Sequence, residues 1–145
     1  MVNVKREIPV DRQEMEKRVL AFAVRSLRFL ESLPTNQITR VIVQQTAKSS
    51  TSIGANYCEA WRAQSRADFI TKIAIAAKEA SETGYWYKIM DELKWGSQDE
   101  CMALAEEARE LLAIMVATGK TAKTRESGKT SNSHTPFAIH HSPSL

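Results

Sequence analysis

Hydrophobic residues recur at every third or fourth position along most of the chain, the spacing that gives a helix one apolar face. The pattern predicts four helices, at about residues 11–32, 35–61, 65–95 and 97–118. No segment alternates apolar and polar residues as a half-buried strand does. Because the predicted connections are short, neighbouring helices must run antiparallel, and we expect an all-α, up-down-up-down four-helix bundle.

Start and stop signals flank the predicted helices. Asp11, Ser65 and Ser97 have side chains suited to N-caps. Pro34 ends the first helix, because the residue before a proline avoids the α conformation. Gly96 suits the position just after the third helix, where a left-handed backbone is common.

The same spacing predicts which residues of the first two helices face inward. These include Met15, Phe22, Leu27, Ile38 and Val41. Residues 46–55 are almost all small, and so many Ser, Thr and Gly residues would alone favour a loop. Because the helical spacing continues through them, we expect a helix that a neighbour can approach closely, with a loop as the alternative.

The composition changes after residue 120 of the 145-residue chain. Residues 121–145 are rich in Ser, Thr, His, Lys and Pro and contain few apolar residues. Such a segment buries too little apolar surface to offset the entropy lost on ordering it. We therefore expect one folded domain, residues 1–120, followed by a disordered polar tail, residues 121–145.

The net charge of +3 is distributed unevenly. Residues 1–66 contain eleven Lys or Arg against six Asp or Glu, whereas residues 67–120 contain six against ten. One half is basic and the other acidic, a division that can steer an anionic partner or dock one subunit against the next.

Nothing in the sequence resembles a targeting or membrane segment. The first residues contain no apolar run like that of a signal peptide, and no stretch approaches the roughly 20 apolar residues of a membrane span. Cys58 and Cys101 belong to no CxxC pair, so we interpret them as reduced thiols. These features predict a soluble cytoplasmic protein.

The predicted bundle lacks the residues that common catalytic sites need. All three histidines, His134, His140 and His141, lie in the predicted tail. A di-metal bundle site and a Ser-His or Cys-His pair each require histidine. Gly54 is not part of a phosphate-binding P-loop motif. We expect no catalytic residues, no metal and no cofactor.

Basic residues of the first helix are the candidates for binding nucleic acid. Arg18, Arg25 and Arg28 share one face of this helix, and Arg12 and Lys17 flank them. Such a stripe can bind a phosphate backbone. An ordinary solvated helix face is the alternative.

Aromatic residues are the candidates for an oligomer interface: Tyr57, Trp61, Tyr85, Trp86 and Tyr87. The last three are consecutive, so they cannot all face one core. We predict that some of these rings anchor a subunit interface. Stacking on nucleic-acid bases is the alternative.

Four polar residues of the second and third predicted helices have a structural interpretation. Asn56 could fix the register of packed helices. Glu59, Glu79 and Glu82 are expected to pair with Lys or Arg within or between subunits. An acid–base pair is the alternative for the carboxylates.

Residues 49–60 read Ser-Ser-Thr-Ser-Ile-Gly-Ala-Asn-Tyr-Cys-Glu-Ala. They resemble the second-helix signature of bacterial four-helix-bundle proteins encoded in intervening sequences of 23S rRNA genes, which are often labelled ribosomal-protein-like. The third helix also matches, at Asp68-Phe69 and residues 72–80, and the resemblance covers about residues 15–115. It implies a homopentamer without an established activity.

The same resemblance extends distantly to the accessory proteins of diversity-generating retroelements, which are basic pentamers that bind nucleic acid and a reverse transcriptase. It therefore implies RNA or a reverse-transcriptase-like protein as partners, besides other copies of the chain. Our hypothesis is a non-enzymatic oligomeric scaffold that binds RNA or an RNA-handling protein through basic surface residues. The alternative is a protein–protein interaction ring with no nucleic-acid contact.

Overall fold

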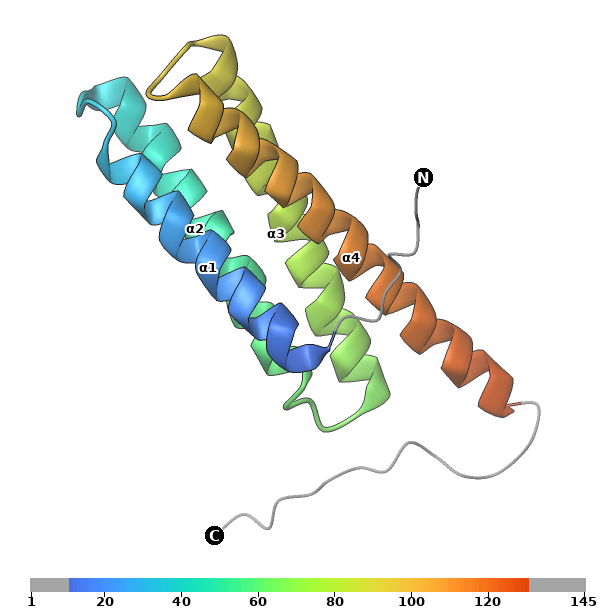
Figure 1. Ribbon diagram of the computed structural model, residues 1–145. Coiled ribbons are helices and arrows are strands. Elements are labelled where there is room, and N and C mark those ends of the chain that lie inside the picture. The colour runs from blue at the N-terminus through green and yellow to red at the C-terminus, as the bar shows by residue number, and fades with distance from the viewer. Residues whose placement is uncertain (1–10, 131–145) are drawn as a thin grey trace, which may run out of the picture.

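The computed structural model describes residues 11–130, except for the side chains of residues 126, 129 and 130. This part of the chain contains four helices and no strand: α1 (Arg12–Glu31), α2 (Gln37–Ala60), α3 (Arg66–Glu92) and α4 (Gln98–Thr130). Consecutive helices run antiparallel and lie side by side (Figure 1). The predicted up-down-up-down bundle is confirmed.

The predicted caps start three of the helices. The Asp11 side chain accepts a hydrogen bond from the backbone N–H of Gln13 at 3.1 Å. Ser65 accepts from the backbone of Asp68 at 3.1 Å, and Ser97 accepts from that of Glu100 at 3.3 Å. Each bond satisfies a donor that the first helical turn leaves unpaired.

The second helix starts slightly later than predicted, because Asn36 is its cap. Its side chain accepts from the backbone of Ile38 and Thr39, and the Thr39 hydroxyl accepts from the backbone N–H of Asn36. The third helix ends at Glu92, earlier than predicted, and both Lys94 and Gly96 in the turn that follows have a positive φ, of +59° and +73°. A Cβ on Gly96 would lie 2.8 Å from Leu33 Cδ2, so glycine also permits close packing on the α1–α2 turn.

The small-residue stretch of α2 is helical, as predicted. Its hydroxyl groups bond to carbonyl oxygens of the preceding turn, such as Thr46 to Ile42 at 2.7 Å and Ser52 to Lys48 at 2.7 Å. These bonds occupy groups that would otherwise compete with the helical backbone. The stretch lets α1 approach closely, because a Cβ on Gly54 would lie only 3.1 Å from Val19 Cγ2.

The core is made of apolar residues from all four helices, among them Met15, Phe22, Ile53, Ile73, Met90, Leu104, Leu111 and Met115. The rings of Phe29 and Tyr87 meet edge to face with centroids 5.9 Å apart. The inward stripe of α1 differs from the prediction, because Leu27 is 39% exposed while Ser26 and Phe29 are buried. Ile38 and Val41 of α2, also predicted to face inward, are exposed.

Packing within the bundle is uneven. The third helix packs along both α2 and α4, whereas α1 and α4 make the sparsest contact of the four neighbouring pairs. A shallow groove therefore runs between α1 and α4. Three of the candidate basic residues of α1, Lys17, Arg25 and Arg28, line this groove.

The fourth helix continues past its predicted end. It was expected to end near residue 118, with disorder from residue 121, but it remains helical to Thr130. The start of α3 supports the extra turns: Arg66 Nη1 donates to the Ala122 carbonyl at 3.4 Å, and Ala122 is buried. The prediction of a disordered tail is thus wrong for residues 121–130, and residues 131–145 lie outside the described part of the chain.

Among the described helices, none is both long and apolar enough to cross a lipid bilayer.

Candidate nucleic-acid interface

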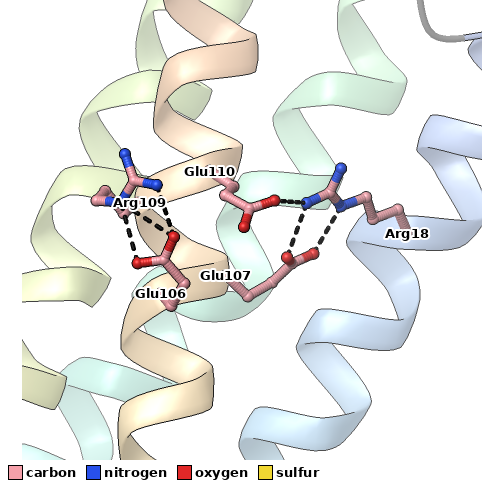
Figure 2. A network of polar contacts seen from close by, with 5 residues as sticks. All are labelled: Arg18, Glu106, Glu107, Arg109 and Glu110. Carbon is pink, nitrogen blue, oxygen red and sulfur yellow. Dashed lines mark hydrogen bonds and ion pairs between the residues drawn. The ribbon is translucent and has the colours of Figure 1, made fainter. Parts of the chain in front are cut away.

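The predicted basic stripe of α1 faces acidic residues of α4. Arg18 donates to Glu107 through Nε at 2.7 Å and through Nη2 at 2.8 Å, and Nη2 also donates to Glu110 at 2.8 Å. Figure 2 shows the guanidinium of Arg18 reaching from α1 to both carboxylates, beside the Arg109–Glu106 pair within α4. These hydrogen bonds to the carboxylates raise the pKa of Arg18, so it stays charged and paired.

A second arginine bridges the same two helices. Arg25 donates to the two oxygens of Glu100 at 2.7 and 2.8 Å. This fork geometry is the strongest form of an Arg–carboxylate contact, and it lowers the pKa of Glu100. Two arginines predicted to meet a nucleic acid thus join α1 to α4 within the protomer.

The other three candidates differ in their surroundings. Arg12 pairs with Glu16 at 3.0 Å, and its guanidinium lies 5.4 Å from the centre of the Trp61 ring. Lys17 and Arg28 are exposed on the edges of the α1–α4 groove. No carboxylate described by the structure forms an ion pair with either of them.

The five aromatic candidates divide between core and surface. Tyr57 and Tyr87 are 3% and 0% exposed, so their rings belong to the protomer core and cannot anchor a subunit interface. Trp61 and Tyr85 are 41% and 60% exposed, and Trp86 is half-buried. The prediction that the consecutive rings diverge is confirmed, and only the exposed ones remain interface candidates.

The polar candidates on α2 and α3 have different partners in the structure. Glu59 pairs with Lys72 at 3.1 Å, as expected for a charge between two helices. Asn56 donates to the Ser52 carbonyl of its own helix, so it does not fix a register between helices. Instead, the hydroxyl groups of Thr83 and Ser49 form a hydrogen bond of 2.7 Å across the α2–α3 contact, and the Thr83 hydroxyl also lies 2.7 Å from the Glu79 carbonyl of its own helix. Little in the sequence indicated this hydrogen bond, because Ser49 is one of many Ser and Thr residues in the small-residue stretch of α2.

Glu79 and Glu82 lie one turn apart on α3, and neither forms an ion pair with a described residue. Burial, and then the nearby charge of Glu82, raises the pKa of Glu79. The expected pairing with Lys or Arg is therefore absent within the described part of the protomer.

The two cysteines are separate free thiols. Burial raises the pKa of Cys101 to about 11, and its Sγ donates to the Tyr87 carbonyl. Burial also raises the pKa of Cys58. Both thiols are protonated at neutral pH, which makes them poor nucleophiles.

An apolar surface that the sequence did not single out lies beside the groove. Leu20, Val24 and Leu27 follow each other at helical spacing along the exposed side of α1, with Leu20 65% exposed. Exposed apolar side chains that gather on one face are typical of a protein–protein contact. The spacing alone could not show this, since it also fits a buried face.

Residues 12–117 match the family described as 23S rRNA-intervening sequence protein. The chain belongs to this family. A solved structure of an S23 ribosomal protein family member of unknown function, from Bacteroides thetaiotaomicron, is 35% identical to this intervening-sequence protein. The match covers 75% of this chain and 97% of the other, with a TM-score of 0.69. No curated protein sequence matches significantly.

The matched range of this intervening-sequence protein covers all of the first three helices and ends within α4. The basic C-terminal turns of α4 lie beyond it. The family likeness thus concerns the bundle, and the last turns of α4 are a feature of this chain to be explained from its own residues.

Proposed function

We propose that this chain is a non-enzymatic, cytoplasmic, oligomeric scaffold that binds RNA or an RNA-handling protein through basic surface residues. Membership of the 23S rRNA-intervening sequence family is the observation that carries the proposal. The chemistry of the surface supports it, because several exposed cations have no partner among the described carboxylates.

The ion pairs of α1 change which residues are assigned to RNA. Arg18 and Arg25 already form ion pairs with carboxylates of α4. If either bound a phosphate instead, Glu107 or Glu100 would lose its partner. Lys17 and Arg28 can reach a phosphate without breaking such a pair. We assign these two residues to RNA on this surface, and we assign Arg18 and Arg25 to holding α1 against α4.

The exposed apolar residues support the oligomeric part of the proposal. Leu20 and Val24 on α1, and Trp61 and Tyr85 at other positions, offer apolar contact area to a second copy. In a ring, which the family resemblance suggests is a pentamer, each basic patch is repeated by symmetry. Weak phosphate contacts then combine into a much higher overall affinity.

The absence of enzymatic activity is proposed on chemical grounds. The thiols have raised pKa values, and within the described residues no three His, Cys, Asp or Glu side chains gather as metal ligands would. Glu79 and Glu82 are the remaining candidates for acid–base chemistry. An activity that is lost when either is changed to Gln, with the fold intact, would contradict this part of the proposal.

Titration of a labelled RNA hairpin at low and high salt tests the RNA-binding proposal. We expect binding at low salt that weakens steeply as salt rises, because each neutralised phosphate releases counterions. Lys17→Glu with Arg28→Glu should weaken binding. A matched pair on other surfaces, Lys88→Glu with Arg40→Glu, should weaken it less. If the unmodified protein binds no RNA at low salt, the proposal is wrong.

The alternative is a protein–protein interaction ring that never contacts nucleic acid. The apolar stripe of Leu20, Val24 and Leu27 is the observation that favours it. Sedimentation velocity gives the oligomeric state, and Leu20→Glu should lower it if this stripe lies between subunits. An oligomer that binds no RNA would support the alternative, whereas a monomer that binds RNA would contradict it.

A further inference from the structure

The charge along α4 changes sign near Gly119. Residues 98–119 contain five Asp or Glu and one Arg, whereas residues 120–130 contain four Lys or Arg and one Glu. The acidic part lies within the bundle, where three of its glutamates form ion pairs with Arg18 and Arg25 of α1. The basic part, residues 120–130, forms the last turns of the helix, and we call it the α4 arm.

The α4 arm extends beyond the rest of the bundle. Near its start, Ala122 is buried and accepts a hydrogen bond from Arg66 in the first turn of α3. The eight residues that follow add about 12 Å of helix at 1.5 Å per residue. Figure 1 shows these turns passing the start of α3, where no other helix covers them.

The described cations of the α4 arm are exposed and unpaired. Lys120, Lys123 and Arg125 are all exposed, and no carboxylate that the structure describes forms an ion pair with them. At about 100° per residue, Lys120 and Lys123 share one side of the helix while Arg125 lies on roughly the opposite side. The arm therefore presents positive charge on both sides, unlike α1, where Arg18 and Arg25 are paired with carboxylates of α4.

We propose that the α4 arm is a phosphate-binding element that contacts the backbone of a structured RNA on both of its sides. The choice of RNA rests on the proposed function, whereas the location rests on the charge and exposure of the arm. Lysine and arginine side chains on a projecting helix can reach phosphates of two neighbouring strands without displacing any carboxylate.

A simpler explanation for the cations is that they stabilise the end of the helix. Positive charges near a helix C-terminus interact favourably with its dipole, and the effect fades within the last turn. Lys120 lies well before the last turn, so this effect does not account for it. The two explanations also differ in outcome, because only phosphate binding makes the affinity for RNA depend on the arm.

The test replaces the three described cations in the full-length protein: Lys120→Gln, Lys123→Gln and Arg125→Gln. Glutamine is a good helix former, so the arm should remain helical. The matched control removes the same charges elsewhere, with Arg40→Gln, Lys78→Gln and Lys88→Gln, all exposed and without a described ion pair. The probes are an RNA hairpin and a DNA duplex, titrated across a series of salt concentrations, with circular dichroism to follow helicity.

We expect the arm variant to bind the RNA hairpin at least about tenfold more weakly at low salt, and the slope of log affinity against log salt to fall by about two. The control variant should change both values much less. The charge-preserving variant Lys120→Arg with Lys123→Arg and Arg125→Lys should bind like the unmodified protein.

Four results would overturn this assignment, each in a different way. If the unmodified protein binds no RNA, the proposed function fails and the arm proposal fails with it. If the unmodified protein binds RNA but the arm variant binds equally well, only the arm proposal fails. Equal losses in the arm and control variants would mean that net charge alone sets the affinity. Equal binding of the DNA duplex would reject RNA as the preferred partner.

Discussion

The guanidinium of Arg18 on α1 holds the carboxylate of Glu107 on α4 with two hydrogen bonds of 2.7 and 2.8 Å. This contact joins the two helices that pack least closely of all neighbours in the bundle. Some of the positive charge of the N-terminal half is therefore neutralised by glutamates of the acidic segment within one protomer. That charge is not available to attract a partner.

The Arg18–Glu107 contact should contribute to stability. We expect Arg18→Gln and Glu107→Gln each to lower the free energy of unfolding by about 1 kcal/mol, since both side chains are partly exposed and solvent screens the pair. The double variant should lose less than the sum of the two, which a double-mutant cycle in denaturant measures. The Arg109–Glu106 pair, exposed and within one helix, is the control and should show a weaker coupling. Full additivity at Arg18 and Glu107 would contradict the prediction.

The buried hydrogen bond from Thr83 to Ser49 should fix the packing of α2 on α3. Thr83→Val keeps the side-chain shape but leaves the Ser49 hydroxyl with only a 3.4 Å contact to the Thr46 carbonyl. We expect a loss of about 1–2 kcal/mol, which is typical for a buried polar group that loses its partner. Adding Ser49→Ala should restore part of that loss.

Equilibrium denaturation of these variants provides the measurement, and Thr71→Val provides the control. Thr71 is exposed, and its hydroxyl bonds only to a carbonyl of its own helix. It should therefore change stability little. Equal stability of Thr83→Val and the unmodified protein would show that the interhelical bond is unimportant.

Gly54 lets α1 and α2 approach closely. Alanine usually stabilises a helix interior by about 1 kcal/mol relative to glycine, but here the new Cβ would lie 3.1 Å from Val19 Cγ2 and 3.2 Å from Val19 Cβ. Val19 is buried and β-branched, so it has little freedom to move away. We expect Gly54→Ala to lower the melting temperature of the bundle.

Two variants show whether crowding by Val19 is the cause. Introducing Gly54→Ala into a Val19→Ala background should cost less stability than in the unmodified protein, because the 3.1 Å contact with Val19 Cγ2 is lost while the 3.2 Å contact with the Cβ remains. Gly84→Ala should be stabilising, because its Cβ would meet only the Ala108 Cβ at 3.9 Å. An equal loss of stability from Gly54→Ala in both backgrounds would mean that the methyl groups of Val19 are not responsible.

Glu79 should make the stability of the bundle depend on pH. Burial raises its pKa in the folded state above the unfolded value, so the charged carboxylate is less favourable when folded. The folded state is therefore penalised at neutral pH, and the penalty disappears as the pH falls through the folded pKa toward the unfolded one. We expect Glu79→Gln to stabilise the protein by roughly a few tenths of a kcal/mol at pH 7, and by less as the pH approaches 4.

Thermal unfolding across this pH range tests the prediction, with Glu92→Gln at the exposed end of α3 as the control. The control shows how much of any gain comes simply from removing one negative charge. If Glu79→Gln instead lowers the melting temperature at pH 7, the carboxylate has a favourable partner, and a basic residue of a neighbouring subunit becomes the explanation.

The predicted helices were confirmed because their signals are local. Asp11, Ser65 and Ser97 cap helices with bonds that span only two or three residues. The small-residue stretch of α2 could also be identified as helix, since helical periodicity persists through it. The phosphate-site and interface candidates rested on the same periodicity, which gives only the side of the helix on which a residue lies.

Tertiary structure decided what each side of a helix meets. The partner of Arg18 is 89 residues away, and no spacing within α1 points to it. Leu27 and Tyr57 are both large side chains within the helical pattern, yet Leu27 is exposed on the side of α1 that faces α2, while Tyr57 is enclosed by its neighbours.

The length of α4 shows the same division between local and long-range causes. The polar composition after residue 120 favoured disorder, whereas the first turn of α3 contacts Ala122 and the helix continues to Thr130. The sequence by itself determined four helices, their order and their antiparallel course, because caps and periodicity act within a few residues. Only the tertiary structure decided which charges are neutralised and which remain on the surface, because those energies depend on contacts between residues far apart in the chain.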